Sequence, residues 1–346
     1  MMVIRPIAKT ELDSLYHLAD KTGVGFTSLV PDEAILKDKI EVSNRSFAKE
    51  TIEGPTDESY LFVLEDTETG DIVGTSGLLA TVGLDEPFYS YHLGKLVHSS
   101  RELGVHNIMP TLVLNNDYTG LSEICTLFLE EGYRHSKNGQ LLSKARFLFL
   151  AQFPERFTNK IFAEMRGVSD DEGRSPLWES LGRHFFSLDF KKADELTALG
   201  SKQFIAELMP SNPVYTAFLS QEAQDCLGQV HHKTAPALRL LQQEGFCYEN
   251  YVDIFDGGPT VEAHVPNIRA VRESRLCLTT ITDETPEKEG AYYLVSNSKL
   301  ADFRCILIQR NRAPGSTLTL SEEEAKHLCV NNKEAVRIVE LSAANP

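Results

Sequence analysis

The stretch EICTLFLEEGYRHSKNGQLLSKARFLFLAQF, residues 123–153, decides how this chain folds. It begins with an apolar, strand-forming run at 124–129, continues through a basic, glycine-containing turn at 130–139, and ends in an apolar run with helical spacing at 140–153. The first N–H groups of a helix lack partners within it, and the helix dipole makes that end positive. The stretch therefore predicts either a phosphate-binding corner or a plain strand-turn-helix corner.

The turn RHSKNG, residues 134–139, resembles the phosphate-binding pattern of the Gcn5-related acyltransferases. That family carries Arg or Gln, then any two residues, Gly, any residue, and Gly or Ala, and holds the pyrophosphate of coenzyme A there. The resemblance implies that Arg134, Asn138 and Gly139 bind this carrier. Lys137 stands where the pattern has its first glycine, and lysine adopts a positive φ less readily than glycine does.

Composition and charge narrow the class of protein. The chain has 346 residues, 42% hydrophobic and 24% charged, which is typical of a globular protein with two or three domains. Its formal net charge of −16 argues against nucleic acid or an anionic membrane as the main partner. No apolar run approaches the roughly 20 residues that span a bilayer, and the first residues do not form a signal peptide. Six scattered cysteines predict free thiols in the cytoplasm, namely Cys125, Cys226, Cys247, Cys277, Cys305 and Cys329.

The elements ahead of this stretch predict an acyltransferase-like order. We expect a strand at 3–6, a helix that 10–13 opens, a second helix at 32–49, and a hairpin from strands at 60–66 and 72–80. Other α+β domains share this order. Residues 88–109 predict a mixture of strands and turns, and the apolar run from residue 110 predicts a separate strand. Within the mixed part, His92 and His98 have no further ligand at a recognised spacing, so we expect no metal site.

Seven longer blocks resemble the bacterial arginine N-succinyltransferase family. They are LNNDYTG at 114–120, SEICTLFL at 122–129, AEMRGV at 163–168, FIAELMP at 204–210, LSQEAQD at 219–225, GQVH at 228–231 and DIFDGGP at 253–259. They keep the family's order and cover essentially the whole chain, more loosely after residue 265. The resemblance implies an α/β (α+β) acyl-CoA N-acyltransferase fold, with a mixed sheet flanked by helices. It also implies transfer of a succinyl group from succinyl-CoA, as co-substrate, to the α-amino group of L-arginine, the first step of ammonia-producing arginine catabolism.

The resemblance assigns two further site residues. Leu127, on the central strand, matches a leucine that binds succinyl-CoA, and His231 matches the family's catalytic proton donor. A pantetheine arm can pair with a strand as an added strand would, so Leu127 would act through its backbone. A histidine titrates near neutral pH and can give or take a proton. Core packing for Leu127 and a helix-end role for a histidine are the alternatives.

The sequence does not decide which residues contact the two substrates. The succinyl carboxylate needs a cationic pocket, and the candidates are Lys95, Arg101, Arg134 and Lys144. Glu164 and Glu207 are candidates for the guanidinium of arginine or for structural pairing. Both glutamates lie in apolar-Ala-Glu-apolar segments, each predicted to be a strand followed after a loop by a helix, at 176–185 and at 215–227. The similarity hints that half of the domain is duplicated.

We predict two domains. Residues 1–265 form the catalytic domain, and residues 266–346 form a small β-rich domain, resembling a barrel, with strands at 291–295, 303–309, 317–320 and 335–341 and a helix opened by a capping box at 321–324. The chain could also form a homo-oligomer, and the sequence leaves this question open. Two alternative functions remain. The same fold could use another acyl-CoA or another amine, such as ornithine, or the chain could be a regulatory module that binds CoA without turnover.

Overall fold

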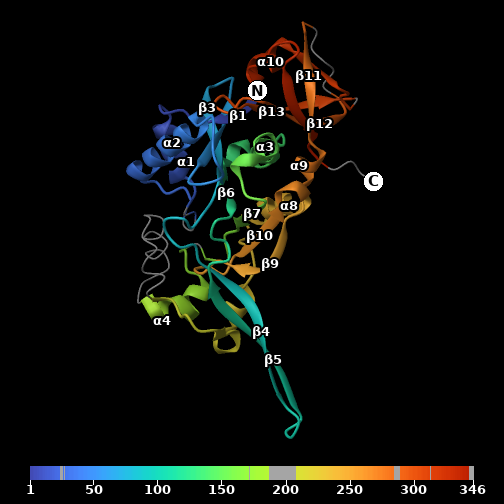
Figure 1. Cartoon of the computed structure of the whole chain (residues 1–346). Coiled ribbons are helices and arrows are strands. Elements are labelled where there is room, and N and C mark those ends of the chain that lie inside the picture. Colours follow the sequence, from blue (N-terminus) through green and yellow to red (C-terminus); the bar gives the residue numbers. More distant parts are fainter. Residues whose placement is uncertain are drawn as a thin grey trace.

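The computed structural model describes residues 1–23, 26, 28–170, 172–186, 208–283, 289–311 and 313–342. Within them, fifteen strands join in one sheet, in the order β14-β11-β15-β12-β13-β1-β2-β3-β6-β7-β10-β9-β4-β5-β8. Figure 1 shows the carboxyl-terminal strands at one end of the molecule and a long hairpin at the other. Among the described residues, no helix combines the length and the apolar character needed to cross a bilayer.

The predicted opening order is confirmed. It consists of β1 (Met2–Pro6), α1 (Leu12–Asp20), α2 (Glu33–Ala48), β2 (Ser59–Asp66) and β3 (Asp71–Leu79). The Glu11 carboxylate at the start of α1 accepts the Ala8 amide and the Arg5 guanidinium, so it braces β1 instead of capping the helix.

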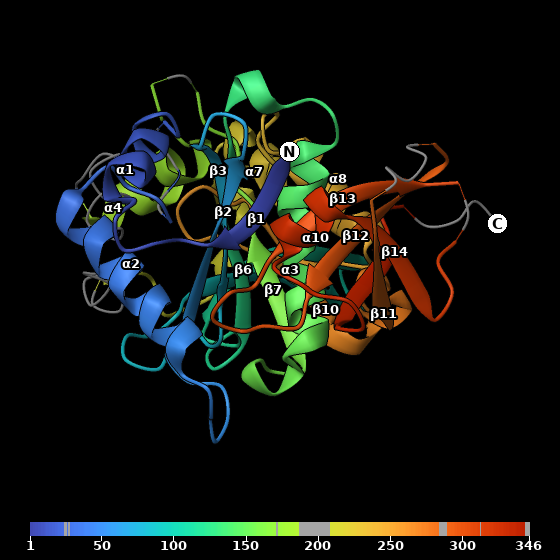
Figure 2. The same cartoon turned by 90° about the horizontal axis from the view of Figure 1, so that it is seen from above.

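The alternation along β2 builds a core on each face of the sheet. Leu61 and Val63 pack with α1 and α2, whereas Tyr60 and Phe62 point to the opposite face and pack with α3 (Asn138–Gln152). Figure 2 shows α1 and α2 on one side of these strands and α3 on the other. The buried helix predicted at 140–153 is therefore confirmed, with the sheet against one of its sides.

A long hairpin follows, formed by β4 (Ser90–Ser100) and β5 (Val105–Asn115). The sequence predicted mixed strands and turns up to residue 109 and a separate strand after it. The structure instead pairs the two strands without interruption, from Ser90 with Asn115 to Ser100 with Val105. The hairpin extends away from the rest of the chain (Figure 1).

The central part of the sheet carries the stretch that decides the fold. Its elements are β6 (Ser122–Leu129), η1 (Glu131–Tyr133), η2 (Pro154–Arg156), β7 (Lys160–Glu164), β9 (Cys247–Val252) and β10 (Pro259–His264). β6 and β7 run parallel, whereas β7, β10 and β9 are joined by antiparallel pairing. The predicted strand at 124–129 is confirmed as part of β6.

The helices after β7 are shorter than predicted. The helix expected near 176–185 appears as a π-helical segment η3 (Trp178–Gly182) and α4 (Arg183–Phe186). The continuous helix expected from 215 to 227 is wrong, because Ser220 caps a new helix there. That region forms β8 (Val214–Tyr215), η4 (Thr216–Phe218) and α7 (Gln221–Cys226), and α8 (Ala235–Gln243) follows. Residues 187–207, including Glu207 and most of the second repeat-like segment, lie outside the described residues.

The carboxyl-terminal part is β-rich as predicted. It comprises η5 (Val265–Asn267), α9 (Arg269–Glu273), β11 (Arg275–Thr282), β12 (Ala291–Asn297), β13 (Cys305–Arg310), β14 (Thr317–Ser321), α10 (Glu322–Leu328) and β15 (Ala335–Glu340). The Ser321–Glu324 capping box is confirmed, whereas β11 was not predicted. β13 pairs with β1, so these strands extend the main sheet. Closure into a barrel and a domain boundary at residue 265 stay predictions.

Candidate active site

An opening in the sheet lies between β6 and β7. These parallel strands pair at Ser122 with Ile161 and at Glu123 with Phe162, and their ladder then ends. β6 continues along β3 to Leu129, and β7 continues along β10 to Glu164. The edge of β6 that would face β7 therefore has no strand partner beyond residue 123 within the described chain. An extended ligand can pair with such an edge.

A β-bulge in β6 lies beside this opening. The pairing with β3 shifts by one residue between Thr75 and Gly77, and Thr126 on β6 has φ 54°. A bulge inserts one unpaired residue and turns the backbone. A Cβ at Gly77 would lie only 3.0 Å from the Cys125 Sγ, so the glycine permits the close approach. Leu127 directly follows, with its half-buried side chain against the main core.

The turn after β6 is built as a helix start. Ser136 and Lys137 have φ values of 49° and 67°, so Lys137 adopts the left-handed conformation that the family pattern assigns to glycine. The Arg134 Nε donates to the Leu129 carbonyl at 3.0 Å, and the buried Asn138 donates from Nδ2 to the Tyr133 carbonyl at 3.1 Å. These two predicted site residues therefore shape the turn.

Two amides at this helix start are available to a ligand. The backbone N–H groups of Gly139 and Gln140 have no hydrogen-bond partner among the described residues. Both belong to the first turn of α3, where the helix dipole adds positive charge. The predicted residue Gly139 thus contributes an N–H, which is the donor that a phosphate requires.

His231 lies on the β7 side of the opening. The ring is buried, and the His231 amide donates to the Arg166 carbonyl at 2.8 Å. Arg166 lies two residues beyond the end of β7, so His231 is attached to the chain that leaves this strand. Leu127 lies on β6 and the 134–139 turn follows it, and a single ligand site shared by these residues and His231 stays a prediction.

The hydrogen bonds of His231 select its tautomer. The Lys233 amide donates to the His231 Nδ1 at 3.2 Å, and the ring lies against His232 with centroids 4.3 Å apart. Because Nδ1 accepts, the proton of the neutral ring is on Nε2. In this tautomer the neutral ring presents an N–H at Nε2 to a hydrogen-bond acceptor.

A buried turn supports the segment that carries His231. Gly167 bridges to Val230, and the Gly167 amide donates to the Asp256 Oδ2 at 2.7 Å. The Asp256 Oδ1 accepts the Gly258 amide at 2.8 Å, and a Cβ at Gly258 would lie 2.1 Å from the Met165 carbonyl oxygen. The DIFDGGP turn thus fixes the backbone at Gly167, which pairs with Val230, the residue before His231.

The same turn holds two neighbouring carboxyl groups away from water. Burial raises the pKa of Asp253 and, together with the charge of Asp253, raises the pKa of Asp256 well above its ordinary value. Asp256 was missed as a supporting residue. The available signal was an Asp-Gly-Gly-Pro turn between two strands rich in apolar residues.

The structure separates the cations proposed for the succinyl carboxylate. Lys144 is buried and its Nζ lies 2.8 Å from the Glu244 Oε1, so its charge is already paired. Lys95 and Arg101 are exposed on the projecting hairpin, away from β6. Of the four candidates, Arg134 alone belongs to the turn beside the opening.

Arg146 is a buried cation that sequence reasoning missed. Its Nη1 donates to the Cys125 carbonyl at the bulge at 3.2 Å, and its Nε donates to the Ser143 carbonyl at 3.0 Å. Burial lowers the pKa of Arg146 to about 10, so the guanidinium stays charged at neutral pH. No carboxylate of the described residues forms an ion pair with it. The available signal was an arginine within an apolar helical run.

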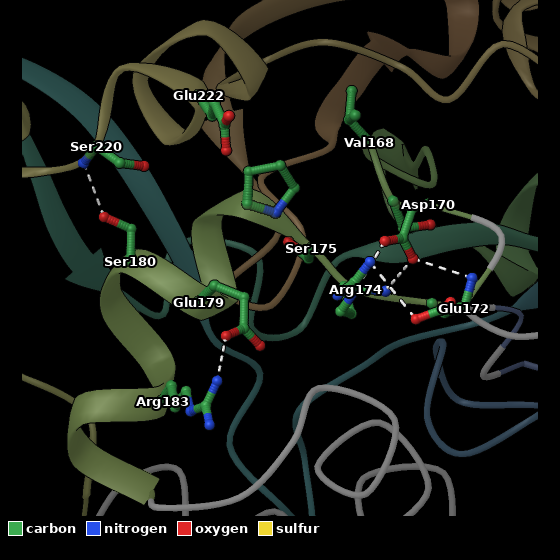
Figure 3. Close-up of a pocket in the computed structure, with 13 residues that line it drawn as sticks. Val168, Asp170, Glu172, Arg174, Ser175, Glu179, Ser180, Arg183, Ser220 and Glu222 are labelled. Carbon is green, nitrogen blue, oxygen red and sulfur yellow. Dashed lines mark hydrogen bonds and ion pairs between the residues drawn. The ribbon is translucent and has the colours of Figure 1, made fainter.

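A polar pocket begins just after Gly167. Its volume is about 950 Å³, and it is lined by residues 168–170 and 172–176, by Glu179, Ser180 and Arg183, and by Ser220 and Glu222. Figure 3 shows Arg174 against Asp170 and Glu172, and Arg183 against Glu179. Glu222 forms no ion pair within the described parts of the chain, so the pocket keeps an excess of negative charge.

Glu164 has a defined place in the sheet. It is the last residue of β7 and lies opposite Thr260 of β10, on the chain that leads to Arg166 and Gly167. Glu207, the other candidate for the guanidinium, is outside the described residues. A role for either glutamate in binding arginine stays a prediction.

Comparisons with known proteins give one family for the whole chain. The family described as arginine N-succinyltransferase beta subunit matches residues 2–270, and its C-terminal domain matches residues 275–340. Arginine N-succinyltransferases of Escherichia fergusonii and Escherichia coli K12 are each 48% identical over 343 residues, covering 99% of this chain and 98% of theirs. The arginine/ornithine succinyltransferase subunit AI of Pseudomonas aeruginosa is 38% identical, with a TM-score of 0.91 over 99% of both chains. The chain therefore belongs to the arginine N-succinyltransferase family of acyltransferases, as its seven sequence blocks predicted.

Proposed function

We propose that this protein transfers the succinyl group of succinyl-CoA to the α-amino group of L-arginine, giving N2-succinyl-L-arginine and CoA as the first step of ammonia-producing arginine catabolism. The opening between β6 and β7, with a positive helix start at its end and His231 beyond β7, carries this proposal. The names of the relatives support the choice of acyl group and amine. Succinyl-CoA acts as a co-substrate, and we expect no resident cofactor.

Succinyl-CoA is proposed to lie along the edge of β6. Its pyrophosphate accepts the Gly139 and Gln140 amides at the start of α3, and Arg134 adds positive charge there. Its pantetheine arm then pairs with the free edge of β6 as an added strand, where Leu127 contributes backbone groups. The thioester carbonyl reaches the bulge, where a backbone N–H stabilises the negative charge that develops on its oxygen.

The transfer is proposed to be direct. The neutral α-amine attacks the thioester carbon, the new C–N bond forms, and the C–S bond breaks as its electron pair leaves on the CoA sulfur. The imidazolium form of His231 gives its Nε2 proton to the thiolate, and the amine proton, carried by solvent, restores that form. Burial raises the pKa of the Cys125 thiol to about 11, so a covalent intermediate at this thiol is disfavoured.

Arg146 is proposed to bind the distal carboxylate of the succinyl group. A buried cation without a counter-ion is costly, and a carboxylate bound in its fork would supply the missing charge. Its hydrogen bond to the Cys125 carbonyl places the guanidinium next to the bulge, where the acyl group would end. Acetyl-CoA lacks this carboxylate, so the contact would favour succinyl-CoA.

The acceptor is proposed to approach through the pocket beside Gly167. Arginine carries a cationic side chain, and Glu222 leaves the pocket with excess negative charge (Figure 3). In the variant Glu222→Gln, the KM for arginine should rise while the KM for succinyl-CoA stays unchanged. The matched variant Glu222→Asp should keep most of the affinity, and equal KM values in all three proteins would remove the pocket from the proposal.

We also propose that the protein works in the cytoplasm. All six cysteines are free thiols, which suits a reducing compartment. A homo-oligomer remains part of the proposal.

Thiol release is the test of the activity. Purified protein is mixed with succinyl-CoA or acetyl-CoA and with arginine, ornithine or lysine, and free CoA is followed over time. Fast release with succinyl-CoA and arginine supports the proposal. Faster release with ornithine favours ornithine as the acceptor, an amine that the name of the Pseudomonas aeruginosa relative includes. Tight CoA binding without any release favours a binding module.

A further inference from the structure

We propose that Asp256 is a positioning residue for the acyl transfer, because it fixes the Arg166–Gly167 peptide group and, through that group, the backbone of His231. Asp256 acts through two hydrogen bonds in series and not by contact with a substrate. This role rests on the one proposed for His231, and it names the side chain that decides where the proton donor lies.

The Arg166–Gly167 peptide group bonds to Asp256 on one side and to His231 on the other. Its N–H donates to the Asp256 Oδ2 at 2.7 Å, and its C=O accepts the His231 amide at 2.8 Å. The N–H and C=O of a trans peptide group point in opposite directions within one plane, and no peptide bond of the described chain is cis. A tilt of this plane at Asp256 therefore moves the acceptor that holds the His231 backbone.

Gly167 makes this peptide group dependent on Asp256. Glycine has wide conformational freedom, so a peptide group beside it rotates easily unless a contact holds it. A Cβ at residue 167 would lie 2.5 Å from the Asp256 Oδ1, so the close approach of the carboxyl group requires glycine here. β7 has already ended at Glu164, and the bridge from Gly167 to Val230 is isolated. A continuous strand ladder therefore does not hold the peptide plane, and the Asp256 carboxyl group does.

The turn that carries Asp256 is itself well held. The Asp256 side chain is buried, and its Oδ1 accepts the Gly258 amide at 2.8 Å. The same turn reaches the His231 segment by a second route, because the Gly257 carbonyl accepts the Gly228 amide at 2.8 Å. One rigid turn thus supports both chain segments that meet at the proposed proton donor.

Two buried aspartates of this turn offer a matched pair of variants. Asp256 uses both carboxyl oxygens, one for each of two amides, whereas the Asp253 Oδ1 alone accepts the amides of Phe255 and Asp256, at 2.7 and 2.8 Å. An asparagine keeps one acceptor oxygen and replaces the other with an NH₂ donor. Asp253→Asn can therefore keep both of its bonds, whereas Asp256→Asn must present a donor to one of its two amides.

The test is a double-mutant cycle on the full-length protein. Asp256→Asn is made alone and together with His231→Ala, and thiol release from succinyl-CoA with arginine gives kcat and both KM values. Alone, it should lower kcat by about ten- to a hundredfold, as displacement of a catalytic group does, while the KM for succinyl-CoA stays unchanged. In the His231→Ala background it should change kcat by less than about twofold, because residues that act through one another are not additive. Asp253→Asn should keep a kcat close to that of the wild type.

Nitrogen-15 NMR of the histidine rings gives a measurement that does not depend on the rate. The Lys233 amide holds the His231 ring with its neutral-state proton on Nε2, and His231→Ala identifies the signals of this ring. Asp256→Asn should shift these signals towards a mixture of both tautomers, whereas Asp253→Asn should not. Asp256→Glu keeps two acceptor oxygens, one methylene further out, so it should retain more of kcat than the asparagine variant. Circular dichroism checks each fold, and Asp256→Glu carries the same cycle where the asparagine variant does not fold.

Three outcomes would overturn the positioning role while leaving the proposed activity intact. They are an equal loss of kcat from the Asp256 variant in both backgrounds, an equal loss from Asp253→Asn, and unchanged ring signals in Asp256→Asn. A wild-type kcat in His231→Ala would instead remove the proposed proton donor, and the role of Asp256 with it. No thiol release by the wild type would overturn the proposed function and this role together.

Discussion

The Lys137 ammonium nitrogen lies 4.8 Å from the centre of the Tyr292 ring. Lys137 belongs to the turn that starts α3, and Tyr292 lies on β12 in the carboxyl-terminal part. The contact connects the β-rich carboxyl-terminal strands to the proposed pyrophosphate site. The attraction between the ammonium group and the ring restricts where the Lys137 charge lies.

Tyr292→Leu should weaken binding of succinyl-CoA. Loss of a cation–π contact at an exposed site costs about 0.5–1 kcal/mol, or about two- to fivefold in affinity. We expect the KM for succinyl-CoA to rise by that factor while kcat and the KM for arginine stay unchanged. Tyr292→Phe keeps the ring and should behave like the wild type. Identical kinetics for the Leu and Phe variants would show that the contact between Lys137 and Tyr292 does not contribute to the binding of succinyl-CoA.

His231→Ala should lower kcat by about 10²- to 10⁴-fold, the usual range for a lost general acid or base. The loss should be largest at low pH, where the ring is protonated and can act as an acid, and CoA should still bind. His232→Ala is the matched control, because this exposed neighbour shares the ring contact. Equal thiol release by wild type and the His231 variant would remove the proposed proton donor.

Arg146→Gln should reduce the preference for succinyl-CoA over acetyl-CoA. A hydrogen bond to a charged group contributes about 1.5–3 kcal/mol, so kcat/KM for succinyl-CoA should fall by roughly tenfold or more. The value for acetyl-CoA should change much less. Arg146→Lys keeps the charge but lacks the two-pronged guanidinium group, so its kcat/KM for succinyl-CoA should lie between those of the wild type and Arg146→Gln. An equal loss with both acyl donors would indicate that Arg146 only supports the bulge.

Local sequence signals predicted one half of the candidate site. The periodicity and turn chemistry of residues 123–153 gave β6, α3 and the turn at Gly139, because each depends on neighbours in the chain. Asp256 and Arg146 were missed because their partners are distant, Gly167 for Asp256 and the Cys125 carbonyl for Arg146. Hydrogen bonds to backbone atoms leave no trace in side-chain patterns.

The β4–β5 hairpin and the backbone of Lys137 were also not predicted, because both depend on distant parts of the chain. The residues of β4 and β5 have ordinary strand composition, and nothing local indicates that no third strand joins them. Lys137 was expected to resist a positive φ, but the structure has φ 67° there. A contact to Tyr292, far along the chain, accompanies this conformation and could not be predicted from the turn alone.

A buried ion cluster should dominate stability where α3 meets the carboxyl-terminal part. The Glu244 Oε1 lies 2.8 Å from both the Lys144 Nζ and the Arg269 Nη2, and the Lys144 Nζ donates to the Leu341 carbonyl. Glu244→Gln leaves the buried Lys144 without a carboxylate and Arg269 with only the exposed Glu273, and should cost about 3–5 kcal/mol in the free energy of unfolding. Lys144→Met should cost less, because the Glu244–Arg269 pair remains.

Glu273→Gln is the control for this cluster. Glu273 also pairs with Arg269, at 3.2 Å, but it is exposed, so its loss should cost under about 1 kcal/mol. Denaturant unfolding measures all three variants. The reverse ranking, with Lys144→Met more damaging than Glu244→Gln, would contradict an electrostatic origin of the stability.

Asp256→Asn should change how stability depends on pH. Burial and the nearby Asp253 raise the pKa of Asp256 in the folded chain, so the folded state retains a proton that the unfolded state loses at about pH 4. Stability from this group is therefore present below pH 4 and declines as pH rises towards the folded pKa, by up to about 1.4 kcal/mol per pH unit. The amide cannot ionise, and the hydrogen bond it loses to Gly167 or Gly258 adds a constant offset. Denaturant unfolding from pH 4 to pH 8 should show wild-type stability falling relative to the variant, whereas parallel curves would mean that Asp256 is ionised in the folded protein.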